Sequence, residues 1–104
     1  MQHLPSDLEK AKVNLETSQI AWRELQRFFA AGQTIAVAAD LDLIEVAYQF
    51  SADNRTLVAA WLQQGVVGPV SDRQASEWYQ DDSPVWAVVV KPWILVQASA
   101  QPAD

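Results

Sequence analysis

Cysteine is absent from this chain of 104 residues, glycine occurs three times, and histidine once. Without cysteine the protein can form no disulfide, has no thiolate nucleophile, and cannot hold zinc or an iron–sulfur cluster through sulfur. The glycine-rich loop that cradles phosphate groups is missing as well. A hydroxyl nucleophile needs a base beside it, and no Ser–His–Asp arrangement can be recognised around His3. The sequence therefore predicts no catalytic residues of these classes.

Long apolar runs are also missing. A membrane-spanning helix needs about 18–20 consecutive apolar residues, and the longest candidate, residues 85–96, is interrupted by Lys91 and Pro92. The first residues do not have the charged-then-apolar pattern of a signal peptide. We therefore expect a cytoplasmic protein without a membrane partner.

Positive charge is scarce, and the formal net charge is −6. The acidic excess lies in residues 33–104, where three basic residues stand against nine acidic ones. Such a surface repels phosphate backbones, so no nucleic-acid partner is expected. It favours a basic protein partner, although solubility alone would also account for it.

The composition itself is that of a folded globular domain. Half of the residues are apolar and 19% are charged, and the length fits one domain with a single core. We expect an N-terminal capping helix within residues 1–19, a core domain at 20–97 and a frayed tail at 98–104.

Helical spacing of apolar residues and capping signals predict five short helices, at about residues 7–16, 19–31, 54–64 and 72–80 and within 40–53. In 40–53 strand alternation can also be drawn through Leu41, Asp42 and Leu43, but the capping box favours a helix. Ser6, Asp42 and Ser71 stand at the N-cap of capping boxes that open three of the helices. Gly32 and Gly65 are placed to end two others in the left-handed conformation.

Strands are predicted at residues 34–38 and 66–70 and in Ser83–Gln97, which reads SPVWAVVVKPWILVQ. Period two puts Trp86 and Val88 on one face of this last segment, yet the other face is equally apolar up to Lys91. Pro92 removes a ladder donor, so we expect a bend, a bulge or a sheet edge there.

These elements predict an α+β fold, with a small, largely antiparallel sheet and four or five short helices. The alternative is a winged-helix-like arrangement, in which residues 54–64 would be the DNA-reading helix. That helix offers Arg55 as its only basic residue, which is too little positive charge for phosphate neutralisation.

Tryptophan is abundant, with five residues. Trp22, Trp61 and Trp78 fall on inward helix faces, whereas Trp86 and Trp93 lie in a segment that is apolar on both sides. That segment supplies the candidate interaction surface, which consists of Trp86, Val88, Val90, Lys91, Pro92, Trp93 and Leu95.

Carboxylates form a candidate acidic patch, made of Asp40, Asp42, Glu45, Asp81 and Asp82. Asp42 and Glu45 are explained by a helix cap and the Asp81–Asp82 pair by a turn, so we assign no catalytic, cofactor-binding or metal-ligating residues. The favoured function is a non-catalytic protein-interaction or self-association module. A small-molecule-binding protein or enzyme with a Trp/carboxylate pocket is the alternative, and a helix-turn-helix-like nucleic-acid binder is a weaker one.

Four segments resemble a known family: IAWRELQRFFAAG (20–32), LDLIEVAYQFSADN (41–54), VAAWLQQGVVGPVSDRQASEW (58–78) and VWAVVVKPWILVQ (85–97). They are similar to a family of short bacterial proteins known as domain-of-unknown-function family 2288 (DUF 2288). The last segment, with Trp86, Pro92 and Trp93 in an apolar frame, is the most specific part. The resemblance implies a bacterial cytosolic protein and brings no activity, cofactor or catalytic residue with it.

Overall fold

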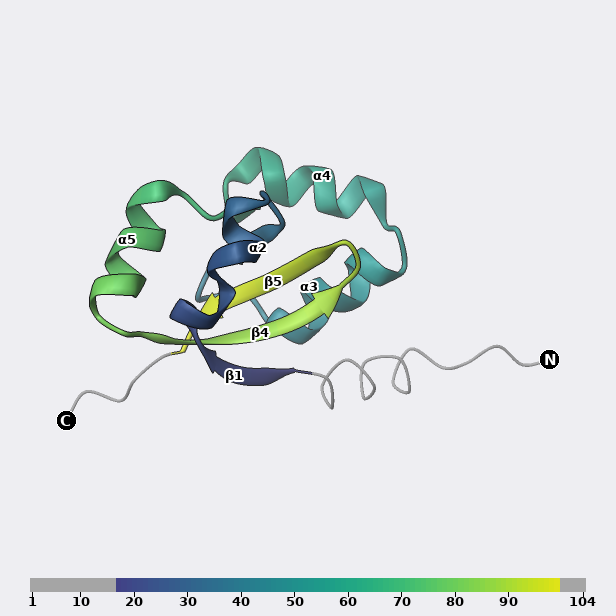
Figure 1. Ribbon diagram of the computed structural model, residues 1–104. Coiled ribbons are helices and arrows are strands. Elements are labelled where there is room, and N and C mark those ends of the chain that lie inside the picture. Colours follow the sequence, from purple (N-terminus) through teal and green to yellow (C-terminus); the bar gives the residue numbers. More distant parts are fainter. Residues whose placement is uncertain (1–16, 100–104) are drawn as a thin grey trace.

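Residues 17–99 are described by the computed structural model, and they form one five-stranded sheet with helices on both faces (Figure 1). The strands are β1 (Ser18–Ala21), β2 (Thr34–Val37), β3 (Val67–Pro69), β4 (Pro84–Val90) and β5 (Trp93–Ala98). The helices are the 3-10 helix η1 (Trp22–Leu25) and the α-helices α2 (Gln26–Ala30), α3 (Leu43–Ser51), α4 (Arg55–Gln64) and α5 (Asp72–Gln80). The predicted α+β class is confirmed.

The order of strands across the sheet is β1-β4-β5-β2-β3. The pairs β1–β4, β4–β5 and β2–β3 are antiparallel, and only β2–β5 is parallel. The apolar C-terminal segment therefore occupies the second and third positions of the sheet. The winged-helix alternative is wrong, because α3 and α4 pack as a layer on the sheet and no wing arrangement forms among the described residues.

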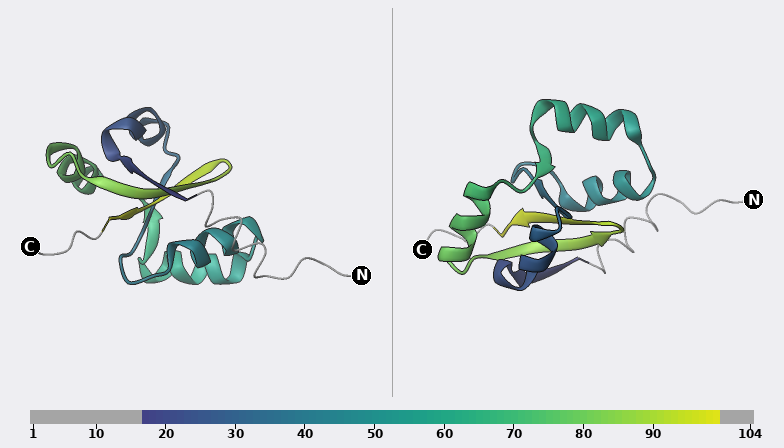
Figure 2. Two further views of the ribbon diagram at one scale, coloured as in Figure 1. Left: turned by 90° about the horizontal axis from the view of Figure 1, so that it is seen from below. Right: turned by 45° about the horizontal axis from the view of Figure 1, so that its top comes forward.

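Helices cover both faces of the sheet, as the two views of Figure 2 show. On one face α3 and α4 pack over a buried cluster that includes Val88 of β4 and Leu95 of β5. On the other face η1, α2 and α5 pack over a second cluster that includes Val85 of β4 and Val96 of β5. The two-sided apolar pattern of the central segment is thus explained by a core on each side of the sheet.

Local sequence signals set several helix ends as predicted. Asp42 caps α3, with its Oδ1 accepting from the Ile44 amide at 3.0 Å, and Ser71 caps α5 in the same way toward Gln74 at 3.1 Å. Gly65 ends α4 with a φ of 77°. These caps depend only on neighbouring residues, which explains why sequence patterns found them.

The helix expected at residues 19–31 is only partly present. Its first residues form the edge strand β1, in which Gln19 lies opposite Trp86 and Ile20 opposite Val85. The backbone turns into η1 at Trp22, whose amide donates to the Ser83 carbonyl at 3.0 Å. Pairing with β4, which is distant in sequence, overrides the helical spacing here. The expected domain boundary at residue 20 falls inside this strand, and the helix expected at 7–16 lies outside the described residues.

The segment 83–97, in which a bend, a bulge or a sheet edge is expected at Pro92, is a hairpin. Residues 91 and 92 form its two-residue turn, the Lys91–Pro92 peptide bond is cis, and β5 returns alongside β4 with Val90 opposite Trp93. Pro92 therefore sits where it removes no ladder hydrogen bond.

Two of the three inward tryptophans form the centre of the second cluster. Trp22 is fully buried, and its ring lies edge-to-face with Trp78 at a centroid distance of 5.1 Å. Trp61 is half-buried and packs at the margin of the first cluster, and Tyr79 of α5 is exposed.

A single amide of β5 holds the loop between β2 and α3. Gln97 Nε2 donates to the carbonyls of Ala38 and Leu41, at 2.8 and 2.7 Å. Both carbonyls belong to the loop that delivers the chain to the N-cap of α3. The side chain thus fixes where α3 begins over the sheet.

Replacing Gln97 by glutamate keeps the shape of the side chain but removes both donors and places a negative charge against two carbonyl oxygens. We expect Gln97→Glu to lower the free energy of unfolding by about 2 kcal/mol in urea denaturation at pH 7. The same change at exposed Gln63 of α4 is the control. It should cost only a few tenths of a kcal/mol, because it places a negative charge in the last turn of a helix. Equal stability of the two variants would show that the amide does not hold the loop.

Candidate functional site

The candidate interaction surface lies on the β4–β5 hairpin but does not form one continuous surface. Val88 and Leu95 lie opposite each other at its middle and are buried under α3. They belong to the core and are not available to a partner. Trp86 and Trp93, toward the two ends of the hairpin, remain 40% and 37% exposed.

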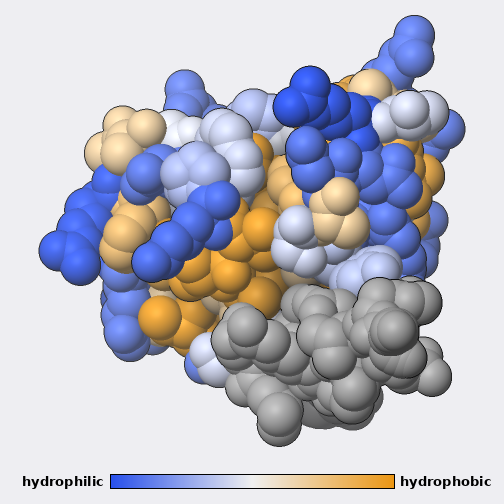
Figure 3. Space-filling model, turned by 90° about the vertical axis from the view of Figure 1, so that its right-hand side faces the viewer, coloured by the Kyte–Doolittle hydropathy of each residue, from blue (hydrophilic) through white to orange (hydrophobic). Residues whose placement is uncertain are grey.

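Trp93 lines an open groove, named here the hairpin groove, between α4, the end of α3 and the hairpin turn. Its volume is about 380 Å³, and its lining residues are Phe50, Asp53, Asn54, Arg55, Val58, Ala59, Leu62, Val90, Lys91 and Trp93. Figure 3 faces the side of the molecule where the hairpin turn and the α3–α4 junction lie, and hydrophobic atoms are open at its centre between hydrophilic ones. All residues of this groove belong to the described part of the chain.

Local structure explains why apolar side chains meet in the hairpin groove. Asn54 caps α4, its Oδ1 accepting from the Leu57 amide at 3.2 Å, so the helix begins directly after it. Val58 and Leu62, one turn apart, then project from the same side of α4 into the groove. The hairpin turn brings Val90 opposite Trp93 on the other wall.

Leu62 lines the hairpin groove but is absent from the candidate surface predicted from the sequence. Helical spacing groups Leu62 with the other apolar residues of segment 54–64, yet its side chain is 48% exposed at the groove. Nothing in the helical spacing separates an apolar residue over the core from one beyond its edge.

Two cations stand among the groove residues. Arg55 Nε lies 3.4 Å from Asp53 Oδ1, and both side chains are strongly exposed. Lys91, at the hairpin turn, has no carboxylate within ion-pair distance among residues 17–99. Lys91 was placed in the candidate surface by sequence, and Arg55 joins it only through the fold.

Trp86 lines a second hollow, of about 320 Å³, with Thr17, Leu41, Asp42, Leu43, Ile44 and Gln97. Its polar groups already have structural roles, because Asp42 caps α3 and Gln97 holds the loop before it. Thr17 at its rim is the first residue that the structure describes.

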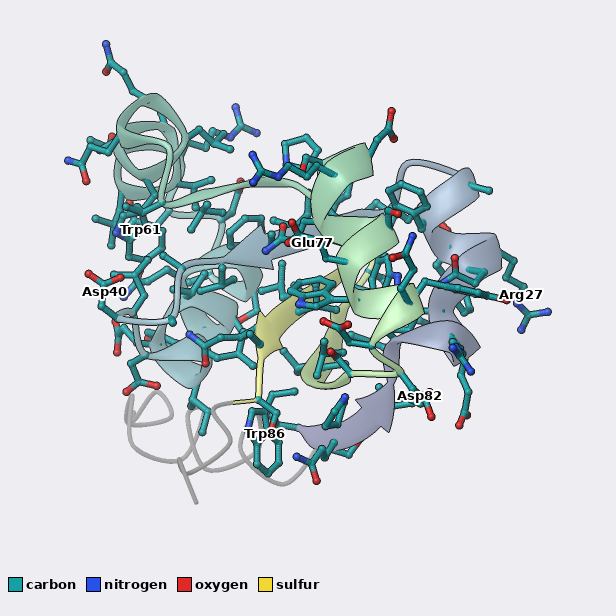
Figure 4. The ribbon with its side chains drawn as sticks, turned by 90° about the vertical axis from the view of Figure 1, so that its left-hand side faces the viewer. Arg27, Asp40, Trp61, Glu77, Asp82 and Trp86 are labelled. Atoms are coloured by element: carbon teal, nitrogen blue, oxygen red, sulfur yellow. The ribbon has the colours of Figure 1, made fainter. Side chains whose placement is uncertain are left out.

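The acidic residues do not form one patch. Asp40, Asp42 and Glu45 lie at the start of α3, whereas Asp81 and Asp82 follow α5, and Figure 4 places Asp40 and Asp82 at opposite sides of the molecule. Asp82 lies 3.7 Å from Arg23. Within residues 17–99 no three acidic or histidine side chains converge as they would around a metal ion.

A family model for proteins of unknown function, DUF2288, matches residues 8–98. The chain belongs to the DUF2288 family. The resemblance noted in the sequence is thereby confirmed, and family membership brings no assigned activity to this chain.

The DUF2288 chain is also similar to a solved structure, the NMR solution structure of PA1075 from Pseudomonas aeruginosa. The identity is 40%, the match covers 100% of this chain and 98% of the other, and the TM-score is 0.79. Among curated proteins none matches the chain. In the part of the chain with described coordinates, no helix combines the length and apolarity needed to cross a bilayer.

Substitution of two adjacent valines of β4 by alanine compares a core position with a surface position. Val88 is 2% exposed under α3, whereas Val89 is 56% exposed on the opposite face. We expect Val88→Ala to lower the free energy of unfolding by about 2 kcal/mol, through lost burial and a residual cavity.

Val89→Ala removes the same two methyl groups and should change the free energy of unfolding by less than about 0.5 kcal/mol. Urea denaturation of both variants measures the contrast. Comparable losses would mean that β4 is not covered as described.

Proposed function

We propose that this DUF2288 protein is a non-catalytic cytoplasmic module that binds another protein through the hairpin groove. The observation that carries the proposal is that Trp93 and Leu62, both partly exposed to solvent, line one groove. Large aromatic and aliphatic side chains left open to water in a concave site are typical of the centre of a protein interface.

The remaining groove residues fit the same role. Val58 and Val90 add apolar surface to the groove, and its polar residues are Asp53, Asn54, Arg55 and Lys91. An apolar centre with a polar margin is the usual anatomy of a binding surface. A partner side chain inserted beside Trp93 would remove apolar area from water without disturbing the core.

A second copy of the chain is the less favoured occupant. In a two-fold dimer the same patch faces itself, so an isologous contact through this groove would bring together two patches in which Arg55 and Lys91 outweigh the one carboxylate, Asp53. Repulsion between like charges opposes that contact. A different protein is therefore the better match.

A small-molecule pocket built from tryptophan and carboxylate is also less favoured. The Trp86 hollow contains Asp42, but its Oδ1 accepts hydrogen bonds from the amides of Ile44 and Glu45. A carboxylate used as a helix cap cannot move toward a ligand without freeing those amides.

Affinity capture from a bacterial lysate, followed by titration calorimetry with the purified partner, tests the proposal. We expect Trp93→Ser and Leu62→Ser each to weaken partner binding about tenfold or more, as for side chains at the centre of an interface. Both side chains are largely outside the core, so circular dichroism should show folded variants.

Tyr79→Ser is the matched control, because Tyr79 is as exposed as Leu62 but lies on α5, away from the groove. It should leave partner binding unchanged. A partner that binds both groove variants at wild-type affinity would rule out this site. If sedimentation equilibrium instead shows a stable dimer that the groove variants abolish, the groove binds a second copy of the chain.

A further inference from the structure

The basic residues of the C-terminal two thirds of the chain are concentrated at the hairpin groove. Residues 33–104 contain three basic residues against nine acidic ones, and two of the three, Arg55 and Lys91, line this one groove. The third, Arg73, lies on α5 beside Glu77 at 3.3 Å. The net charge of the chain is −6, so the position of two basic side chains beside exposed apolar ones in one groove suggests a role in binding.

Neither cation is needed by the fold. The Arg55–Asp53 pair is exposed on both sides, and such pairs contribute little to stability. Lys91 has no carboxylate partner in the described chain, and its side chain is exposed at the hairpin turn. Asp53 is the only acidic residue of the groove lining, so the lining carries a local positive charge.

Each wall of the hairpin groove places one basic residue beside apolar residues. On α4, Arg55 comes first and is followed at helical spacing by Val58 and Leu62. On the hairpin, Lys91 stands at the turn and Val90 and Trp93 flank it. Each wall therefore presents a cation next to an apolar surface.

We propose that the hairpin groove binds an acidic amphipathic segment of the partner protein. One or two apolar side chains of the segment would contact Trp93, Leu62 and Val58, and an adjacent Asp or Glu would pair with Lys91 and Arg55. This inference rests on the proposed function and names the chemistry of its partner. It reverses the expectation of a basic partner, because charge at the groove acts within about a Debye length of roughly 8–10 Å while the acidic groups elsewhere are screened.

A peptide selection tests the inference with random sequences in place of a natural partner. The folded full-length chain is immobilised, and a phage library of random peptides is selected against it. We expect the enriched peptides to combine apolar residues with Asp or Glu. The strongest binder is then synthesised and titrated against variants by calorimetry.

Lys91→Gln and Arg55→Gln should each weaken the peptide several-fold, and the double variant should weaken it tenfold or more. Lys91→Arg keeps the charge and should retain binding. Arg73→Gln removes the same charge from α5 and should leave the affinity unchanged. Raising the salt concentration should weaken the wild-type complex and have little effect on the double variant.

The outcomes separate this inference from the proposed function. Enriched peptides that are apolar but neutral or basic, and that bind Lys91→Gln as well as the wild type while losing affinity for Trp93→Ser, would overturn the acidic segment and leave the groove as the binding site. Peptides that bind Trp93→Ser and Leu62→Ser at wild-type affinity would overturn both, as would a selection without enrichment.

Discussion

The central hairpin has to be covered by side chains on both of its faces, and the rest of the fold follows from that constraint. Val85 and Val96 pack against η1 and α5, and Val88 and Leu95 pack against α3. A strand apolar on both faces is stable only inside a sheet with a layer on each side. The described helices that supply those layers all lie between β1 and β4 in the sequence.

On the face that α3 covers, the hairpin is buried at its middle, at Val88 and Leu95, and partly exposed toward both ends, at Trp86 and Trp93. Helix α3 closes over Val88 and Leu95, while α4 lies farther out and leaves Trp93 and Leu62 open beside the turn. The groove is thus a product of the same packing that forms the core. The exposed apolar side chains of the groove lie at the margin of the core, and Arg55 and Lys91 give that margin a charge opposite to that of the whole chain.

Sequence patterns predicted the elements whose cause is local. The Asp42 and Ser71 caps depend on a side chain and an amide two or three residues away, and the stop at Gly65 depends on its own φ. The strand at Ser18–Ala21 was missed because its pairing with β4 joins residues that are far apart in the sequence. Alternation along Trp86–Gln97 assigned the faces correctly but could not show which parts of a face α3 would cover.

By itself the sequence determined an α+β domain with a two-sided apolar hairpin segment, membership of a family, and an acidic character without the residues of common catalytic sites. These properties follow from composition, period and nearest neighbours. Tertiary structure alone decided that Val88 is core while Trp93 is exposed, that Asp40 and Asp82 are far apart, and that Arg55 and Lys91 share one groove. The physical reason is that burial and charge proximity depend on how α3, α4 and the hairpin pack, and packing joins residues that no local pattern relates.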